Sequence, residues 1–130
     1  MSHSAVPTTV VDHHNEVRLV GRVAAEPVVS VMPSGDEVVT ARLVVDRPRP
    51  PAGRGRMSGV DTIACAAWSP EVRRVVRVWR QGDIVEVTGS LRRRFWRSPE
   101  GARSRFEIEV ATASRLVRAP DAPVNPPADA

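Results

Sequence analysis

The sequence contains no lysine, and all 19 of its basic residues are arginines. The planar guanidinium group of arginine pairs with phosphate through two parallel hydrogen bonds and also stacks on aromatic rings. A GC-rich coding sequence would produce the same bias, so the absence of lysine by itself assigns no function.

Cysteine is nearly absent as well. Cys65 is the single cysteine, which excludes a disulfide framework and indicates a reducing compartment. Its position in the apolar run IACAAW predicts a small buried core residue. No apolar run approaches the roughly 18 residues that cross a bilayer, and the N-terminus lacks the pattern of a signal peptide. The sequence therefore predicts a soluble, cytoplasmic protein.

Residues suited to catalysis or metal binding are scarce. His3, His13 and His14 all precede the expected domain, so no histidine there can activate Cys65. The sequence has no glycine-rich phosphate loop ending in lysine and no paired ligand spacing for zinc. These absences predict a protein that is not an enzyme and that holds no cofactor and no metal ion.

Three segments are expected along the chain. Residues 1–14 are polar and aperiodic, and residues 119–130 contain four prolines, so both are predicted to be disordered tails. Residues 15–118 are predicted to form one domain, which contains all 19 arginines and 12 of the 15 acidic residues; 19 minus 12 gives +7. Such a charge predicts an anionic partner, but does not choose between nucleic acid and a membrane surface.

Most of this domain has the alternating apolar pattern of half-buried strands. Gly21, inside the first strand, is expected to mark a bulge or a sharp bend. In the last strand, Phe106, Ile108 and Val110 are expected to face the core. The five expected strands cover about residues 17–23, 39–45, 60–68, 84–96 and 105–110.

One helix interrupts the strands. Ser69 is suited to cap its start, and Gly82 is suited to end it. An apolar stripe at helical spacing is expected to face the core and consists of Val72, Val75, Val76 and Trp79. Three strands, a helix and two strands form the order of an OB-fold, an all-β, five-stranded Greek-key barrel with one helix between strands 3 and 4.

A cluster of arginines and aromatic residues lies between Gly89 and Gly101. Alternation places Arg92, Arg94 and Trp96 on the outer face of the fourth strand, while Phe95 points the other way as a core or hairpin-packing residue. Trp68 is expected to face outward at the end of the third strand. Its ring could stack on a base, form part of a subunit interface, or pack on the start of the helix. Cations beside exposed rings are typical of single-stranded nucleic-acid binding.

The proline- and glycine-rich loop at residues 47–59 carries four more arginines: Arg47, Arg49, Arg54 and Arg56. These arginines are candidates for contacts along a phosphate backbone, which would add salt-sensitive affinity. The loop is equally compatible with a flexible insertion that binds nothing specific.

The domain resembles the bacterial single-stranded DNA-binding protein family. The resemblance rests on the segments NEVRLVGRVAAEPVV, MPSGDEVVTARLVV, DTIACAAW, VWRQGDIVEVTGSLRRRFW and RFEIEVATASRLV, which together span nearly all of residues 15–118. Gln81 replaces the basic residue that usually precedes Gly82. The resemblance implies an OB-fold that assembles as a homotetramer, wraps single-stranded DNA without catalysis, and serves replication, recombination or repair at the nucleoid.

By the same resemblance, Trp68 and Trp96 match two base-stacking aromatics of the family, and Arg92 and Arg94 match basic residues beside the DNA path. Two other stacking positions lack aromatics, one at Thr62 and one near Arg47 and Pro48. Their loss predicts weaker binding. Compensation by the arginine-rich loop predicts a steep dependence of affinity on salt.

The C-terminal sequence PPADA differs from the family, whose members typically end in an acidic tip closing on Pro-Phe. This difference predicts a short paralogue that does not recruit partner proteins through such a tip.

Two other functions remain open at this point. The same fold could serve as a protein-interaction or oligomerisation module with reduced DNA binding, or as an RNA-binding OB domain, because stacking platforms and phosphate contacts suit both nucleic acids. The first strand offers an edge for pairing with a second copy, and nothing in the residues decides between a dimer and the tetramer of the family.

Overall fold

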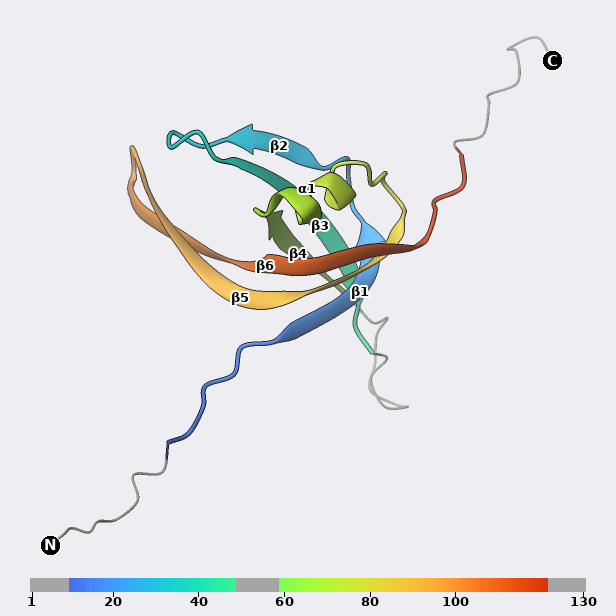
Figure 1. Cartoon of the computed structure of the whole chain (residues 1–130), viewed down its shortest axis with the longest axis horizontal. Coiled ribbons are helices and arrows are strands. Elements are labelled where there is room, and N and C mark those ends of the chain that lie inside the picture. The colour runs from blue at the N-terminus through green and yellow to red at the C-terminus, as the bar shows by residue number, and fades with distance from the viewer. Residues whose placement is uncertain (1–9, 49–58, 122–130) are drawn as a thin grey trace, which may run out of the picture.

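The computed structural model describes residues 10–48 and 59–121. Within these ranges the chain forms six strands and one helix (Figure 1). No helix in this part of the chain is long and apolar enough to cross a membrane. The elements are β1 (Val17–Val23), β2 (Val28–Val31), β3 (Glu37–Asp46), β4 (Val60–Ala67), α1 (Pro70–Val76), β5 (Ile84–Ser98) and β6 (Gly101–Val117).

Five of the strands close into a barrel. The hydrogen-bonded order is β1-β5-β6-β4-β3, and β1 also pairs with β3, with Arg22 opposite Val44 and Val23 opposite Leu43. β4 and β6 are parallel, whereas the other neighbours are antiparallel. Helix α1 lies between β4 and β5, as the sequence predicts.

Gly21 lies where β1 crosses β3 and closes the barrel. A Cβ atom at this position would lie 2.5 Å from the carbonyl oxygen of Val44, so only glycine allows the two strands to approach. Of the two features expected at Gly21, a bulge or a sharp bend, the bulge is absent, because β1 pairs with β5 without interruption from Val17 to Arg22. A register shift occurs instead between Thr88 and Gly89, where β5 pairs with β6.

β2 was not predicted. It pairs with β3 as a short antiparallel hairpin, from Val28 opposite Thr40 to Val31 opposite Glu37. The turn at residues 32–36 joins the two strands through hydrogen bonds between Met32 and Asp36 and between Met32 and Gly35. Because β2 lies at the edge of the sheet and three of its four residues are exposed, its sequence lacks the alternation that marks a half-buried strand.

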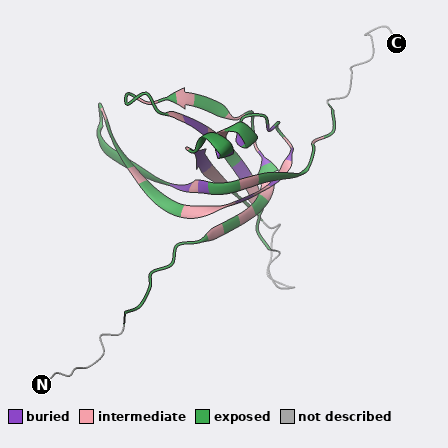
Figure 2. Cartoon of the chain, in the orientation of Figure 1, coloured by how far each residue is buried: buried purple, intermediate pink, exposed green. Residues whose placement is uncertain are grey.

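The core lies inside the barrel and under α1 (Figure 2). Cys65 and Trp79 belong to it, as the sequence predicts. The other fully buried large apolar side chains come from β1, β3, α1 and β5 and are Val23, Val39, Leu43, Val76, Val85 and Val87.

Helix α1 is shorter than predicted. Ser69 caps it as expected, because its Oγ accepts a hydrogen bond from the amide of Val72. The helix ends at Val76, and the chain then turns so that Trp79 reaches the core. Val75 is exposed instead of buried. Gly82 lies six residues beyond the helix, where its φ of 93° suits a turn that only glycine adopts readily.

β5 and β6 form a long hairpin that extends beyond the barrel (Figure 1). Ile108 and Val110 pack in the core as predicted, but Phe106, on the same face, is 58% exposed. The prediction of a core position for Phe106 is wrong, because the hairpin continues past the strands that would cover it. Leu91 of β5 is also exposed, although it pairs with the buried Ile108.

Candidate nucleic-acid interface

Trp68 is fixed in place by the elements on both sides of it. It follows the last residue of β4 and precedes the cap of α1. The Arg73 side chain donates hydrogen bonds through Nη1 to the carbonyl oxygens of Trp68, at 2.9 Å, and Glu37, at 2.8 Å. This arginine therefore ties the end of β4 to the start of β3 and holds the backbone that carries the indole.

Trp68, Arg94 and Trp96 line one groove of about 550 Å³. The sequence predicts a shared outward surface of Trp68, Arg92, Arg94 and Trp96. The structure brings three of them together in this groove, which Arg92 does not line. The remaining wall of the groove comes from β2, β3, β4 and the hairpin and consists of Ser30, Met32, Val38, Thr40, Ala66, Phe95, Arg105 and Glu107. Trp68 also lines a second hollow of about 900 Å³ that includes Thr88, Ser90 and Glu109.

A guanidinium group lies over each indole. The Cζ atom of Arg94 is 5.0 Å from the ring centroid of Trp68, and that of Arg105 is 5.7 Å from the centroid of Trp96. Both distances fit cation–π contacts. Trp96 keeps 45% of its surface exposed, whereas Trp68 is half-buried and its Nε1 has no hydrogen-bond partner among the described residues. Trp96 is therefore the more open of the two rings.

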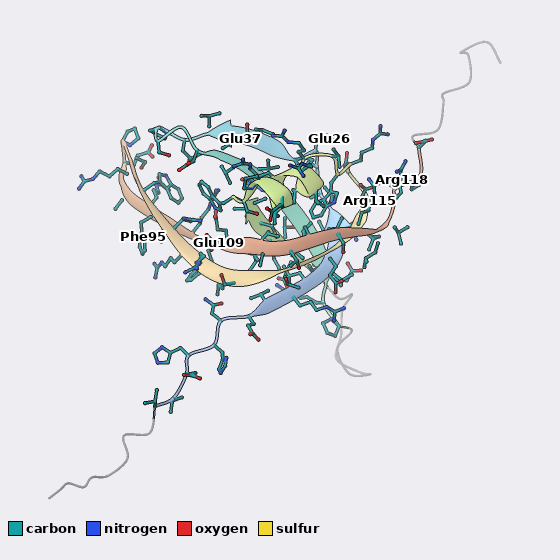
Figure 3. All side chains as sticks on the ribbon, viewed as in Figure 1. Glu26, Glu37, Phe95, Glu109, Arg115 and Arg118 are labelled. Carbon is teal, nitrogen blue, oxygen red and sulfur yellow. The ribbon has the colours of Figure 1, made fainter. Side chains whose placement is uncertain are left out.

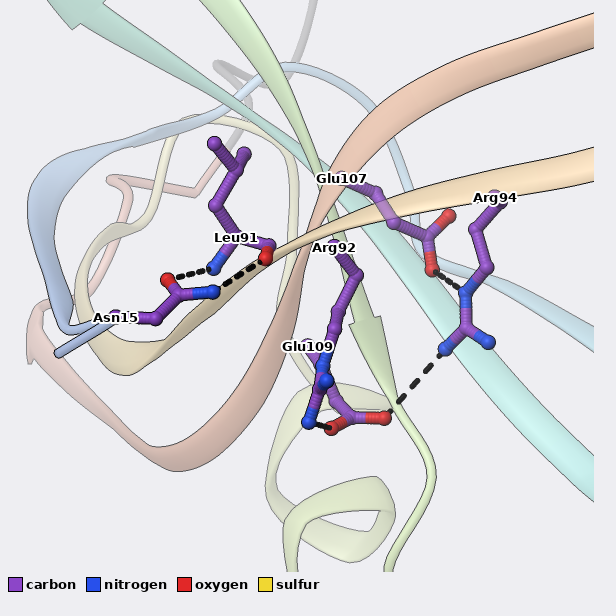
Figure 4. Close-up of polar contacts among 6 residues, drawn as sticks. All are labelled: Asn15, Leu91, Arg92, Arg94, Glu107 and Glu109. Carbon is purple, nitrogen blue, oxygen red and sulfur yellow. Dashed lines mark hydrogen bonds and ion pairs between the residues drawn. The ribbon is translucent and has the colours of Figure 1, made fainter. Parts of the chain in front are cut away.

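Two carboxylates hold the arginines of this surface (Figure 4). Arg94 contacts Glu107 at 2.9 Å and Glu109 at 3.5 Å, and Arg92 contacts Glu109 at 3.2 Å. Arg105 lies 3.5 Å from Glu107, which is only 3% exposed. Burial of Glu107 is tolerated because two guanidinium groups compensate its charge.

Glu107 and Glu109 are not among the residues that the sequence predicts for this surface. The strand register contains the signal that could have found them. Arg92 pairs with Glu107 across the hairpin, and Ser90 pairs with Glu109, so these side chains share the face of Arg94. Three arginines and two glutamates leave this patch with one net positive charge.

Asn15 joins the segment before β1 to β5. Its Nδ2 donates a hydrogen bond to the carbonyl oxygen of Leu91, and its Oδ1 accepts one from the amide of Leu91, both at 2.8 Å (Figure 4). The amide side chain thus takes the place of a backbone partner and helps to form the wall of the larger hollow, which Asn15 lines.

The sequence model of the Single-strand binding protein family matches residues 14–116. The chain belongs to this family. It is 32% identical to "Single-stranded DNA-binding protein 3" of Listeria innocua over 68% of this chain and 54% of that protein. It is 31% identical to "Single-stranded DNA-binding protein A" of Bacillus subtilis over 77% of this chain and 56% of that protein. The chain thus spans little more than half the length of these relatives.

A solved structure supports the OB-fold prediction. The protein in "Plasmodium falciparum SSB complex with ssDNA" superposes with a TM-score of 0.67 at 22% identity, over 84% of this chain and 98% of that chain. At this level of identity the match establishes the fold. Together with the closed barrel and its single helix, it confirms the predicted architecture.

The arginines outside the hairpin do not join the groove in the described structure. Arg47 donates two hydrogen bonds to Oδ1 of Asp61, from Nε at 3.1 Å and from Nη2 at 2.7 Å. Asp61 precedes Trp68 by seven residues, and at about 3.3 Å per strand residue the two lie about 20 Å apart. Three further candidates lie outside the described residues: Arg49, Arg54 and Arg56.

Thr62 and Phe95 both lie exposed, but only Phe95 carries a ring. Thr62, at a position where the family resemblance implies a stacking aromatic, is exposed on β4 and offers no ring. Phe95 was predicted as a core or hairpin-packing residue; it is 71% exposed, so the core alternative is wrong. Its ring lies instead beside the guanidinium group of Arg93, 5.1 Å from Cζ to centroid. This chain therefore carries an exposed ring on its hairpin in addition to that of Trp96.

Proposed function

We propose that this chain binds single-stranded DNA with little sequence preference and without catalysis, in the groove lined by Trp68, Arg94 and Trp96. The observation that carries the proposal is the presence of two indoles in one open groove, each with a guanidinium group over its ring. Bases stack on such rings irrespective of their identity. Membership of the Single-strand binding protein family and the names of the relatives support the same function.

In this proposal Trp96 is the principal stacking residue, because it is the more exposed indole. Trp68 stacks a second base together with the guanidinium plane of Arg94. Arg92 and Arg94 contact phosphates with the part of their hydrogen-bonding capacity that the glutamates leave free. Arg47, Arg49, Arg54 and Arg56 add salt-sensitive contacts along the strand.

The test is a titration of intrinsic tryptophan fluorescence with oligothymidylate of about 35 nucleotides, enough for several OB-fold site sizes, at low and moderate salt. Tight binding with strong quenching supports stacking on the indoles. Binding that lacks quenching and disappears as salt rises would mean that the contact is purely electrostatic. Competition with an RNA oligomer of the same length and sequence separates DNA binding from RNA binding.

An interaction module is the second candidate, and one observation favours it. Glu107 and Glu109 neutralise much of the charge that a phosphate backbone would require. Changing Arg92 and Arg94 together to Gln discriminates the two functions. The double variant loses DNA binding if the groove holds DNA, and it keeps DNA binding if the face serves protein contacts. Arg74→Gln, on the exposed side of α1, is the matched control.

The proposal extends to assembly and cellular role. β1 pairs with β5 along one edge, but on its other edge only Arg22 and Val23 pair with β3 within the described residues. This leaves residues 17–20 free to pair with a second copy, which suits a homodimer or the homotetramer implied by the family resemblance. Sedimentation equilibrium of the full chain distinguishes them. A protein of this kind would act in DNA replication, recombination or repair, in the cytoplasm at the nucleoid.

A further inference from the structure

The hairpin has a second exposed face, opposite the side that carries Trp96. Strand alternation and the register place Leu91, Arg93 and Phe95 of β5 on this face, together with Phe106 of β6, which pairs with Arg93. Figure 3 shows Phe95 on the part of the hairpin that extends away from the barrel. We call these four residues the phenylalanine face.

Two phenyl rings on this face are largely uncovered. Phe95 is 71% exposed and Phe106 is 58% exposed. Single exposed apolar residues are common on protein surfaces, but neighbouring exposed aromatic rings mark sites of interaction. The fold alone does not require either ring, because both lie beyond the strands that enclose the core.

A guanidinium group lies between the two rings. The Cζ atom of Arg93 is 5.1 Å from the centroid of Phe95 and 5.3 Å from that of Phe106. Its Nε and Nη2 donate hydrogen bonds to Oγ of Ser104 at 3.3 and 3.1 Å. Arg93 is therefore held in a fixed orientation by neutral partners.

The charge of Arg93 is uncompensated. Arg92, Arg94 and Arg105 each lie within 3.5 Å of a glutamate oxygen, whereas Arg93 forms no ion pair within the described parts of the chain. The β6 residues opposite residues 91–97 on this face are Ile108, Phe106, Ser104 and Ala102, none of which is acidic. This face thus combines two rings with a cation and carries no negative charge.

We propose that Arg93, Phe95 and Phe106 form a second contact site for single-stranded DNA, so that the hairpin holds the strand on both of its faces. The site takes bases on the phenyl rings and a phosphate on the free guanidinium group. The uncompensated cation favours a polyanion over an apolar protein surface. This inference rests on the proposed function and adds contacts on the other face of the hairpin, where Arg93 pairs with Phe106, while Phe95 also lines the groove of Trp68 and Trp96.

The first experiment compares DNA affinity of the full chain with that of the double variant Phe95→Leu, Phe106→Leu. Leucine keeps an apolar side chain but removes the flat ring, so stacking is lost while the hairpin is retained. Affinity for oligothymidylate of about 35 nucleotides is expected to fall by at least about fivefold. Val31→Ala, at another exposed apolar position, is the control and is expected to bind as the wild type does.

A second variant tests the proposal independently, in case the double variant disrupts the hairpin. Arg93→Gln removes only the cation, and is expected to reduce the slope of log affinity against log salt by about 0.7, the contribution of one phosphate contact. Thermal unfolding monitored on both variants verifies that the domain is intact. An unchanged salt slope together with unchanged affinity of the double variant overturns the second site.

Photocrosslinking locates the strand directly. Oligothymidylate carrying 5-iodouracil is irradiated in complex with the full chain, and tryptic peptides are sequenced by mass spectrometry. Cleavage after Arg105 and Arg115 gives a peptide that contains Phe106 and no tryptophan. An adduct on Phe106 supports the second site, whereas adducts restricted to Trp68 and Trp96 overturn it.

The outcomes separate the two proposals. If wild-type protein binds no oligomer, the proposed function and the second site both fail. If wild-type protein binds with tryptophan quenching and the double variant binds equally well, only the second site fails. A change in sedimentation of the double variant with unchanged DNA affinity identifies the phenylalanine face as a contact between copies and overturns the inference.

Discussion

Arg94 contacts both the aromatic and the acidic side chains of the groove. It lies over Trp68 and reaches Glu107 and Glu109, so its guanidinium group has partners on several sides. A surface arginine without partners could offer all of its hydrogen-bond donors to a phosphate, whereas Arg94 already uses some of its donors for carboxylates. In the proposed function, Arg94 therefore positions Trp68 as much as it contacts DNA.

Trp96→Ala tests the most exposed ring of the groove. We expect DNA binding to weaken by about 1–3 kcal/mol, because one base loses its stacking partner. The free energy of unfolding should change little, since the indole lies on the hairpin outside the core. Oligothymidylate titration at fixed salt measures the first quantity and urea unfolding the second. Trp96→Phe should retain most of the affinity; equal affinity of all three proteins would contradict stacking.

The Cys65 thiol is expected to be inert in the folded protein. Burial, with a smaller effect of Glu107, raises the pKa of this thiol to about 12, so almost no thiolate exists near neutral pH. Iodoacetamide at pH 8 should leave the native protein unmodified and should alkylate it fully in urea, as measured by mass spectrometry. Rapid alkylation without urea would show that the strands around Cys65 open readily.

Outward positions were predictable from alternation at Arg94 and Trp96, which lie on β5, and at Trp68, which directly follows β4. The partners of the arginines were not predictable, because they depend on the register between β5 and β6. This register shifts between Thr88 and Gly89, and the apolar pattern of the sequence does not reveal the shift. Glu107 is buried for the same reason. Its carboxylate lies under arginines that only the register brings to it.

At the scale of the elements, Asp83 joins three parts of the chain. Its carboxylate accepts hydrogen bonds from the amides of Arg80, at 2.9 Å, and Ala119, at 2.7 Å, and lies 3.5 Å from Arg115. The side chain is fully buried. Burial alone would raise the pKa of Asp83, but the hydrogen bonds from Ala119, Arg80 and Arg115 outweigh it and hold the pKa below its usual value.

Asp83→Asn is expected to lower the free energy of unfolding at pH 7 by about 2 kcal/mol, because charge-assisted hydrogen bonds are lost. A carboxylate whose pKa is lowered by folding stabilises the protein above its usual pKa, and this stabilisation is lost as pH falls through the folded value. The difference between wild type and variant should therefore shrink below about pH 4. Urea unfolding at several pH values measures it, with Glu16→Gln as an exposed control. A difference independent of pH would contradict this role.

Gly21→Ala tests the closure of the barrel. The added Cβ would lie 2.5 Å from the carbonyl oxygen of Val44, so β1 and β3 must separate. We expect a loss of about 1–3 kcal/mol in the free energy of unfolding, as for overpacking elsewhere. Gly59→Ala is the matched control, because its nearest contact would be the end of the Arg47 side chain at 3.8 Å. Equal stability of the two variants would show that β1 can shift without penalty.

The type and order of most elements could be predicted, whereas their ends could not. The regular apolar periods of β1, β3 and β4 correspond to strands, and Ser69 marks the start of α1 correctly. The end of α1 was missed because Trp79 continues the helical spacing while the chain has already turned to bury it. β2 was missed because an edge strand buries little and shows no alternation.

At the scale of the whole molecule, positive charge is distributed unevenly between the groove and the loop after β3. The groove arginines are compensated by glutamates, and Arg47 by Asp61. If the loop contacts phosphates, changing Arg49, Arg54 and Arg56 to Gln should reduce the slope of log affinity against log salt by about 2. Titrations at four or more salt concentrations measure the slope. An unchanged slope would indicate an insertion without a role in binding.

The glutamates beneath the groove also determine the stage at which the arginines become ordered. A solvent-exposed arginine loses up to about 2 kcal/mol of rotamer entropy when a ligand immobilises it. Arg92, Arg94 and Arg105 already have fixed carboxylate partners in the folded chain. Much of their ordering therefore takes place during folding, and in the proposed function a nucleic-acid strand meets a surface whose side chains are prearranged.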